Sequence, residues 1–136
     1  MKLLNAPVLF QRLLTASAPE GATVANDLDV DAFDEIPFIT HTSILAQDRN
    51  GRGLWSVTLT INIFLDPSGA HEVVSAVYEA IHAWGEDPDA AIVPGVGAVE
   101  TVEDLNAFIP VSGEIAMVNK TVRHYQGTFN IGARVH

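Results

Sequence analysis

The chain has 136 residues, contains no cysteine and carries a formal net charge of −10. Its length suits one domain with a single core, and the lack of cysteine excludes disulfides and thiolate chemistry. Binding to nucleic acid requires clustered cations, but no Lys or Arg occurs between Gly53 and Asn119. The acidic balance therefore excludes a nucleic-acid-binding function.

The surface is expected to be poor in charge. Charged residues make up 18% of the chain, against about 25% in ordinary soluble domains, and the mean hydropathy is +0.22. Either other subunits cover part of the exterior, or the core is simply well filled, and composition leaves both interpretations open. No segment reaches the roughly 18 apolar residues that a membrane span requires, and no signal-peptide pattern is seen.

Residues 3–17 predict an amphipathic helix. Pro7 is compatible with its first turn if Asn5 or Ala6 is the cap. The apolar face, at i, i+3, i+4 and i+7 spacing, consists of Phe10, Leu13, Leu14 and Ser17. Residues 19–35 are polar and acidic, and predict an irregular connection.

Residues 36–65 predict a β-hairpin. The first half, 36–46, is rich in Ile, Phe and Thr, but its imperfect alternation leaves the buried face undecided. The turn signal Asn50-Gly51 follows. Residues 54–65 then alternate strictly. One side of this strand consists of Trp55, Val57, Leu59, Ile61, Ile63 and Leu65, and the other of Ser56, Thr58, Thr60 and Asn62.

A helix is predicted from Asp66 to about Trp84. Asp66 suits its N-cap, Pro67 its first helical position and Gly85 its C-terminal end. The apolar stripe consists of Val73, Val74, Val77, Ile81 and Trp84. Residues 86–96 predict a loop and 98–103 a short strand, whereas 104–113 are ambiguous.

Residues 121–135 predict a second clear strand, with Gly127 on its apolar side. The expected fold is α+β, a mainly antiparallel β-sheet with helices packed on one face, in a single domain spanning 1–136. The expected core consists of Trp55, Val57, Leu59, Ile61, Val77, Ile81, Trp84, Tyr125, Phe129 and Ile131.

The non-core faces of the two clear strands are polar but nearly free of charge. Such a face suits contact with another protein surface, where unpaired charges would be costly. Equally, Thr-rich strands can reflect β-propensity alone. The candidate subunit-contact face consists of Thr58, Thr60, Asn62, His124, Gln126 and Thr128.

No motif predicts catalysis, a metal site or a cofactor site. His71 and His82 are eleven residues apart on the predicted helix, roughly 16 Å along its axis and too far to share a metal. Asp27, Asp29 and Asp31 begin like a calcium loop, but the required Gly and Glu are missing. No P-loop, dinucleotide turn or nucleophile elbow is present.

Three parts in fixed order carry a resemblance to a known family. They are the hairpin at 36–65, the helix at 71–84 that follows at once, and an ending of the form basic–x–Tyr–x–Gly–x–Phe at 123–129. Together they resemble the tail terminator (tail completion) proteins of long-tailed phages with non-contractile tails.

The resemblance implies a structural virion protein without catalytic residues or cofactors. Such proteins form a homo-oligomeric ring, typically a hexamer, on the last ring of the major tail tube protein. The ring stops tube growth and joins the tail to neck or head-completion proteins, while DNA passes through without specific binding. A neck or head-closure adaptor and a small ligand-binding or enzymatic module are the alternatives.

The turn between the hairpin strands is a candidate partner contact. Arg49, Asn50 and Arg52 form its most distinctive part, and we expect it to touch an acidic surface of the tube or of a neighbouring subunit. A solvated basic hairpin tip is the alternative.

Overall fold

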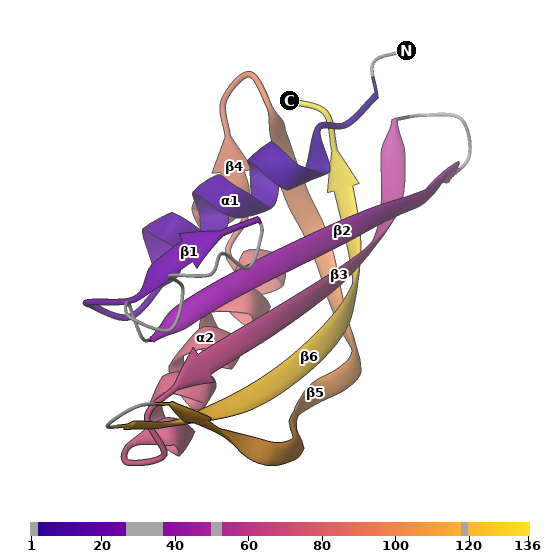
Figure 1. Ribbon diagram of the computed structural model, residues 1–136. Helices are drawn as coiled ribbons and strands as arrows, with labels where there is room; N and C mark the ends of the chain where they lie inside the picture. The colour runs from indigo at the N-terminus through magenta and orange to yellow at the C-terminus, as the bar shows by residue number, and fades with distance from the viewer. Residues whose placement is uncertain (1–2, 27–36, 50–52, 118–119) are drawn as a thin grey trace.

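The computed structural model describes residues 3–26, 37–49, 53–117 and 120–136 (Figure 1). Its elements, in chain order, are α1 (Ala6–Ser17), β1 (Thr23–Ala25), β2 (Phe38–Arg49), β3 (Leu54–Leu65), α2 (Ala70–Glu86), the short 3-10 helix η2 (Pro88–Ala91), β4 (Ile92–Val93), β5 (Gly97–Met117) and β6 (Lys120–Arg134). The strands form one sheet in the order β1-β2-β3-β6-β5-β4. Only the pairing of β1 with β2 is parallel, so the predicted α+β fold with a mainly antiparallel sheet is confirmed.

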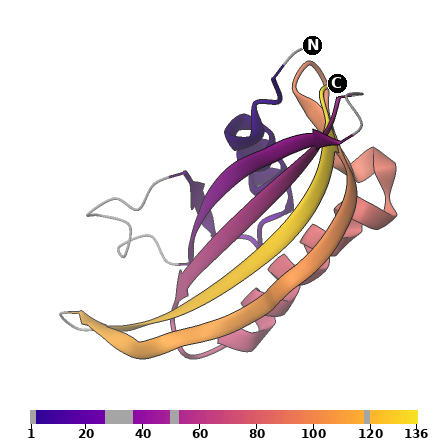
Figure 2. The ribbon, with the colours of Figure 1, turned by 90° about the vertical axis from the view of Figure 1, so that its right-hand side faces the viewer.

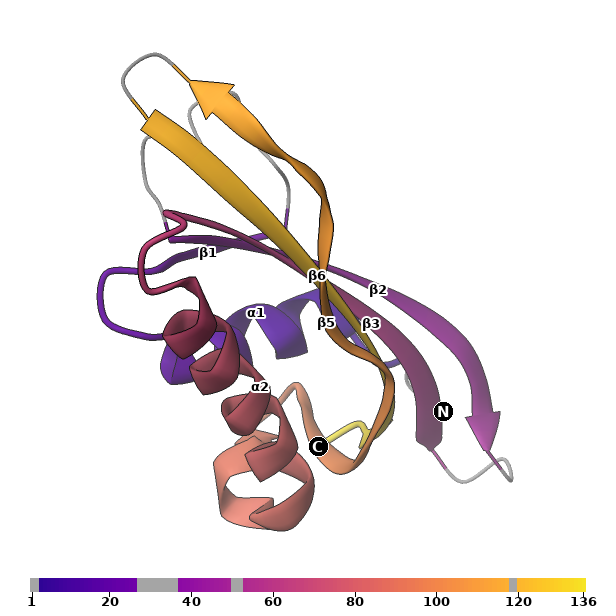
Figure 3. The same ribbon diagram turned by 90° about the horizontal axis from the view of Figure 1, so that it is seen from below.

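Both helices lie on one face of the curled sheet, as Figure 3 shows from below. Trp84 of α2 is 1% exposed, and its ring centroid lies 6.1 Å from that of Phe10 of α1. Among the expected core residues, Trp55 and Tyr125 are only half-buried and pack against the edge of the core. The fully buried ones are Val57, Leu59, Ile61, Val77, Ile81, Trp84, Phe129 and Ile131.

Helix α1 begins where its capping residues predict. The side chain of Asn5 accepts a hydrogen bond from the backbone N–H of Val8, and Pro7 occupies the first turn. The buried face contains Leu9 and Ala6 in addition to the predicted Phe10, Leu13 and Leu14. The polar i+7 residue, Ser17, is half-buried at the rim of this face.

The hairpin prediction is confirmed, and β3 spans the predicted residues 54–65. Strand β2 pairs with β3 from Phe38↔Phe64 to Arg49↔Leu54, with one bulge between Leu45 and Gln47. The bulge affects only the residues that follow it, so it does not cause the imperfect alternation of residues 36–46. That alternation is imperfect because both sides of β2 mix residue types. Apolar Phe38 and Ile44 lie on one side, and the polar but fully buried His41 lies on the other.

The expected start and end of the second helix are wrong. Helix α2 begins after Gly69, which has a φ of 76°, and the side chain of Asp66 instead accepts from the backbone N–H of Ser68 at 2.9 Å. Gly85 lies within the helix rather than beyond it. A Cβ there would lie 3.2 Å from the backbone nitrogen of Val102, so this glycine allows α2 to approach β5 closely.

The region after α2 contains more strand than the sequence predicts. Strand β5 has 21 residues, whereas only 98–103 were expected to be extended. Register shifts interrupt its pairing with β6 at four places, and each shift breaks the alternation that would identify a strand. Within the predicted irregular stretch 19–35, the short strand β1 was also missed, and residues 27–36 lie outside the described residues.

A buried polar contact joins α1, β1 and β2. His41 is 0% exposed, and its Nε2 lies 2.7 Å from Oε1 of Gln11. The amide nitrogen of Gln11 donates to the carbonyl oxygen of Val24 at 2.9 Å. The Gln11 oxygen must therefore accept from His41, which places the imidazole hydrogen on Nε2. Burial lowers the pKa of His41 to about 4, so the ring is neutral near pH 7.

We expect Trp84→Ala to lower the free energy of unfolding by ~3–5 kcal/mol, because it removes the largest fully buried side chain and leaves a cavity. Urea denaturation followed by circular dichroism measures the loss. A loss under about 1 kcal/mol would mean that the Trp84 site is not tightly packed.

Stability should also fall as the pH drops from about 6.5 to about 4. The unfolded chain protonates His41 at its ordinary pKa, whereas the folded protein resists protonation, so the unfolded state binds more protons over this range. The effect is at most about 3 kcal/mol and should be reduced in His41→Gln. Urea denaturation of the unmodified protein and of His41→Gln at several pH values gives the free energy of unfolding of each. The difference between the two pH dependences is due to His41, because all other groups titrate in both proteins. If the free energy of unfolding depended on pH equally in the two proteins, His41 would not be the group whose pKa is lowered by folding.

Candidate assembly surface

The sheet face opposite the helices brings together all six residues of the predicted contact face. Strands β3 and β6 pair in register along the whole of β3, with Thr60 opposite Thr128 and Asn62 opposite Gln126. Strand β2 continues the Thr60–Thr128 pair with Thr42, which lies opposite Thr60. The six side chains are half-buried and consist of Thr58, Thr60, Asn62, His124, Gln126 and Thr128. We call this surface the outer face.

Hydrogen bonds across the strands hold polar side chains of the outer face in place. His124 Nε2 lies 2.7 Å from Asn62 Oδ1, and the amide nitrogen of Gln126 donates to the same oxygen at 3.1 Å. Burial lowers the pKa of His124, which favours the neutral ring. This part of the outer face is therefore uncharged near pH 7.

Charge is placed at the rim of the outer face. Arg134, opposite Leu54 at the end of the β3–β6 ladder, pairs with Glu100. Glu103 lies opposite Asn130 on β5. The pattern suits burial against another protein surface, while β-propensity remains a sufficient reason for the threonines.

A small second core interrupts the polar outer face at one end. It consists of Phe38, Phe64 and Val122, with Ala25 packed against it. The Phe64 ring stacks on His124, with centroids 4.3 Å apart. Sequence reasoning missed this cluster, because Phe38, Phe64 and Val122 come from three different strands and meet only when the sheet forms.

The predicted basic contact loop is only partly within the described residues. Arg49 ends β2 opposite Leu54, whereas Asn50 and Arg52 lie outside the described residues. The role of this loop therefore stays a prediction.

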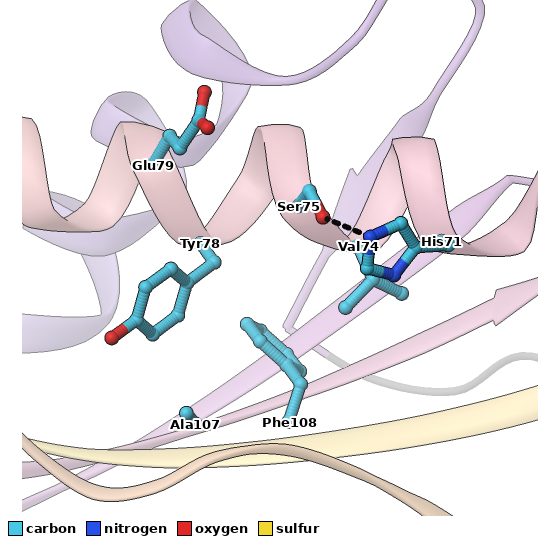
Figure 4. Close-up of a pocket in the computed structure, with 7 residues that line it drawn as sticks. All are labelled: His71, Val74, Ser75, Tyr78, Glu79, Ala107 and Phe108. Carbon is cyan, nitrogen blue, oxygen red and sulfur yellow. Dashed lines mark hydrogen bonds between the residues drawn. The ribbon is translucent and has the colours of Figure 1, made fainter.

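A groove of about 320 Å³ runs between α2 and β5 (Figure 4). Its lining consists of His71, Val74, Ser75, Tyr78, Glu79, Ala107 and Phe108. Figure 4 shows the rings of Tyr78 and Phe108 side by side below the helix, with His71 hydrogen-bonded to Ser75. The sequence did not indicate this groove, because its floor belongs to the ambiguous stretch 104–113.

Phe108 is held in an unusual backbone conformation. Its φ is 92°, the only positive φ of a described non-glycine residue, and such a conformation persists only where its surroundings enforce it. Gly127 of β6 provides the space, because a Cβ there would lie 2.8 Å from the Phe108 ring. The ring also makes an edge contact with Phe129, with centroids 5.6 Å apart. Gly127 and Phe129, the Gly and Phe of the closing motif, thus form the packing site of the Phe108 ring.

A polar network lies beside the groove. Tyr78 donates to Asp104 Oδ2 at 2.5 Å, and His82 Nε2 lies 2.6 Å from Asp104 Oδ1. Desolvation acts to raise the pKa of Asp104, but the hydrogen bonds from Tyr78 and His82 outweigh it and hold this pKa below its usual range. The bond to Asp104 raises the pKa of Tyr78. The network ties α2 to the bulged part of β5.

The polar groups at the groove can be compared with two known arrangements, a catalytic triad and a metal site. Its Ser75–His71 pair is separated by 3.4 Å, and within the described residues no carboxylate is hydrogen-bonded to His71 to orient it as in a catalytic triad. In the described part of the chain, no three His, Asp or Glu side chains gather as a metal site.

Comparison with models of known protein families and with curated proteins finds no match for this chain. Neither of the helices in the described ranges is long and apolar enough to cross a membrane.

Gly127→Ala should destabilise the protein by ~1–3 kcal/mol, because the added methyl group would clash with the ring of Phe108. In a Phe108→Ala background the same change should cost much less, since the clashing ring is gone. Urea denaturation of the two single variants and the double variant gives the coupling energy. Additive losses would show that Gly127 does not serve to seat Phe108.

Proposed function

We propose that this protein is a structural phage assembly protein that forms a ring on the tail tube. In this proposal the ring stops polymerisation of the tube protein and joins the tail to the neck or head-completion protein. It acts in the virion, at the head-proximal end of the tail, and has no catalytic task.

The observation that carries the proposal is the outer face itself. Half-buried Thr, Asn and Gln side chains occupy the middle of β3 and β6, and the exposed Thr42 continues them on β2. Among the described residues, the charged groups of this face lie at its rim. A face that must only contact water normally gains solubility from interspersed charges. Repeated contact with protein, from sister copies or from the tube, explains why the centre of this face is uncharged.

The closing strand adds support through its resemblance to tail terminators. Tyr125 and Phe129 lie on the helix side of β6, with Gly127 between them. This spacing lets Phe108 cross the sheet surface above the glycine, so the Gly and Phe of the motif have a shared structural role in this fold.

Charge is compatible with a DNA passage. Each copy carries −10, and a ring multiplies that charge. Acidic walls repel phosphates, so passing DNA would not be retained by salt-sensitive contacts.

Two other functions have their own support. A neck or head-closure adaptor would also form a ring, and deletion of the gene separates the two roles. Tails of uncontrolled length favour a terminator, whereas normal tails without heads favour an adaptor. A ligand-binding module is favoured by the groove between Tyr78 and Phe108, and a strictly monomeric protein in light scattering would support it.

Thr60→Glu should reduce the fraction of tail tubes capped by rings in electron micrographs at least several-fold, because it places a charge at the centre of the outer face. Thr60 is flanked by the neutral Thr42 and Thr128. The matched control is Ala76→Glu on the exposed side of α2, which should leave capping intact. Circular dichroism verifies that both variants fold. Equal capping by the two variants would argue against a role for the outer face.

A further inference from the structure

The sheet has two long strand edges without a described partner. Strand β2 pairs with β1 only from Phe38 to Thr40, and β5 pairs with β4 only at Gly97 and Ala98. Beyond these short contacts, the outer sides of β2 from 42 to 49 and of β5 from 99 to 111 meet no other described strand. Figure 2 shows the two strands on opposite sides of β3 and β6.

Both edges expose apolar side chains. Ile44 on β2 is 68% exposed, and on β5 Leu105 is 55% and Ile109 is 51% exposed. Ile44 lies opposite Thr58 and Ile109 opposite Gln126, so both belong to the outer face by register. Large apolar residues on an unpaired strand edge invite pairing with another chain.

We propose that copies of this chain join head to tail, with the β2 edge of one copy against the β5 edge of the next, so that Ile44 packs against Leu105 and Ile109. This inference rests on the proposed ring and names its joint. Strands β2 and β5 run in opposite directions in the sheet. If the sheet of the next copy continues that of the first, β2 of one copy therefore runs antiparallel to β5 of its neighbour. A heterologous contact of this kind gives a ring when its rotation closes, and the closed ring leaves no free sheet edge.

The distribution of charge favours this pairing. When Ile44 faces Ile109 in an antiparallel register, the residues that follow Ile44 on β2 face the residues that precede Ile109 on β5. The end of β2, where the basic residue Arg49 stands opposite Leu54, then approaches Glu103, which lies in the register of the outer face. Opposite charges on facing strands stabilise a pair.

Pairing of β5 with β5 of a second copy is disfavoured by the same charges. In an antiparallel pair centred on the acidic segment, Glu103 would face Glu103 of the other copy, and like charges on facing strands repel. The bulges and Pro110 along this edge also limit unspecific strand addition. The acidic β5 edge therefore fits a different edge better than its own.

Cysteine cross-linking tests the joint directly, because the natural chain contains no cysteine. The variants Ile44→Cys/Ile109→Cys and Ile44→Cys/Leu105→Cys are assembled, oxidised mildly and run on a non-reducing gel. Facing residues of an antiparallel pair come about 4.5–5.5 Å apart, which suits a disulfide. At least one double variant should give a ladder that ends at the number of copies in the ring. Each single variant can give no more than dimers.

Electron microscopy of the reduced double variants separates the joint from the proposed function. Rings without a ladder would overturn the joint and leave the ring proposal standing, whereas a chain with neither rings nor ladder would overturn both. Strong dimers from Ile109→Cys alone would show β5–β5 pairing and also overturn the joint. As a second measurement, Ile44→Asp should shift the sedimentation profile to monomers, while Ala76→Glu keeps the assembled species. Assembly of Ile44→Asp at the unmodified level would count against the joint.

Discussion

The pairing of β3 with β6 fixes which side chains enter the core and which remain outside. The two strands run antiparallel in one register from Leu54↔Arg134 to Leu65↔Arg123. Because side chains alternate between faces, a slip of one residue would send Ile61 and Phe129 outward and bring threonines under the helices. The strict alternation in both strands therefore specifies the core and the outer face together.

Gly127 in β6 is linked to the irregular shape of the neighbouring strand β5. At Gly127 the helix side of β6 has no side chain, and the ring of Phe108 fills the space. To reach it, β5 departs from regular pairing on both sides of Phe108 and adopts a positive φ there. The same departure forms the floor of the groove under α2 and leaves Leu105 and Ile109 exposed. The packing of Phe108 over Gly127 in the interior thus influences the surface, because the irregular strand β5 carries both Phe108 and the exposed Leu105 and Ile109.

This dependence explains which parts the sequence could predict. The hairpin, both helices and β6 follow local periodicity, and their residue types suffice to predict them. The long strand β5 does not, because its pairing repeatedly shifts and its partner β6 supplies the regularity that its own residues lack. Similarly, Gly85 looks like a helix terminator, but the approach of Val102 decides its place inside α2. The outer-face residues could be named from alternation, whereas the groove depended on a contact between α2 and an unpredicted strand.

Two long edges of the sheet meet no other described strand, and edges of this kind invite pairing with other chains. Charges and bulges protect the β5 edge, where Glu103 and Asp104 stand beside the exposed Leu105. The β2 edge has no such charge from Thr42 to Ala46, and Ile44 lies in its middle. Two edges of equal character would pair with themselves and yield dimers or unlimited aggregates. In the proposed ring the two unlike edges would select each other, which would give the subunits one direction, and curvature of the sheet would then close the assembly instead of extending it.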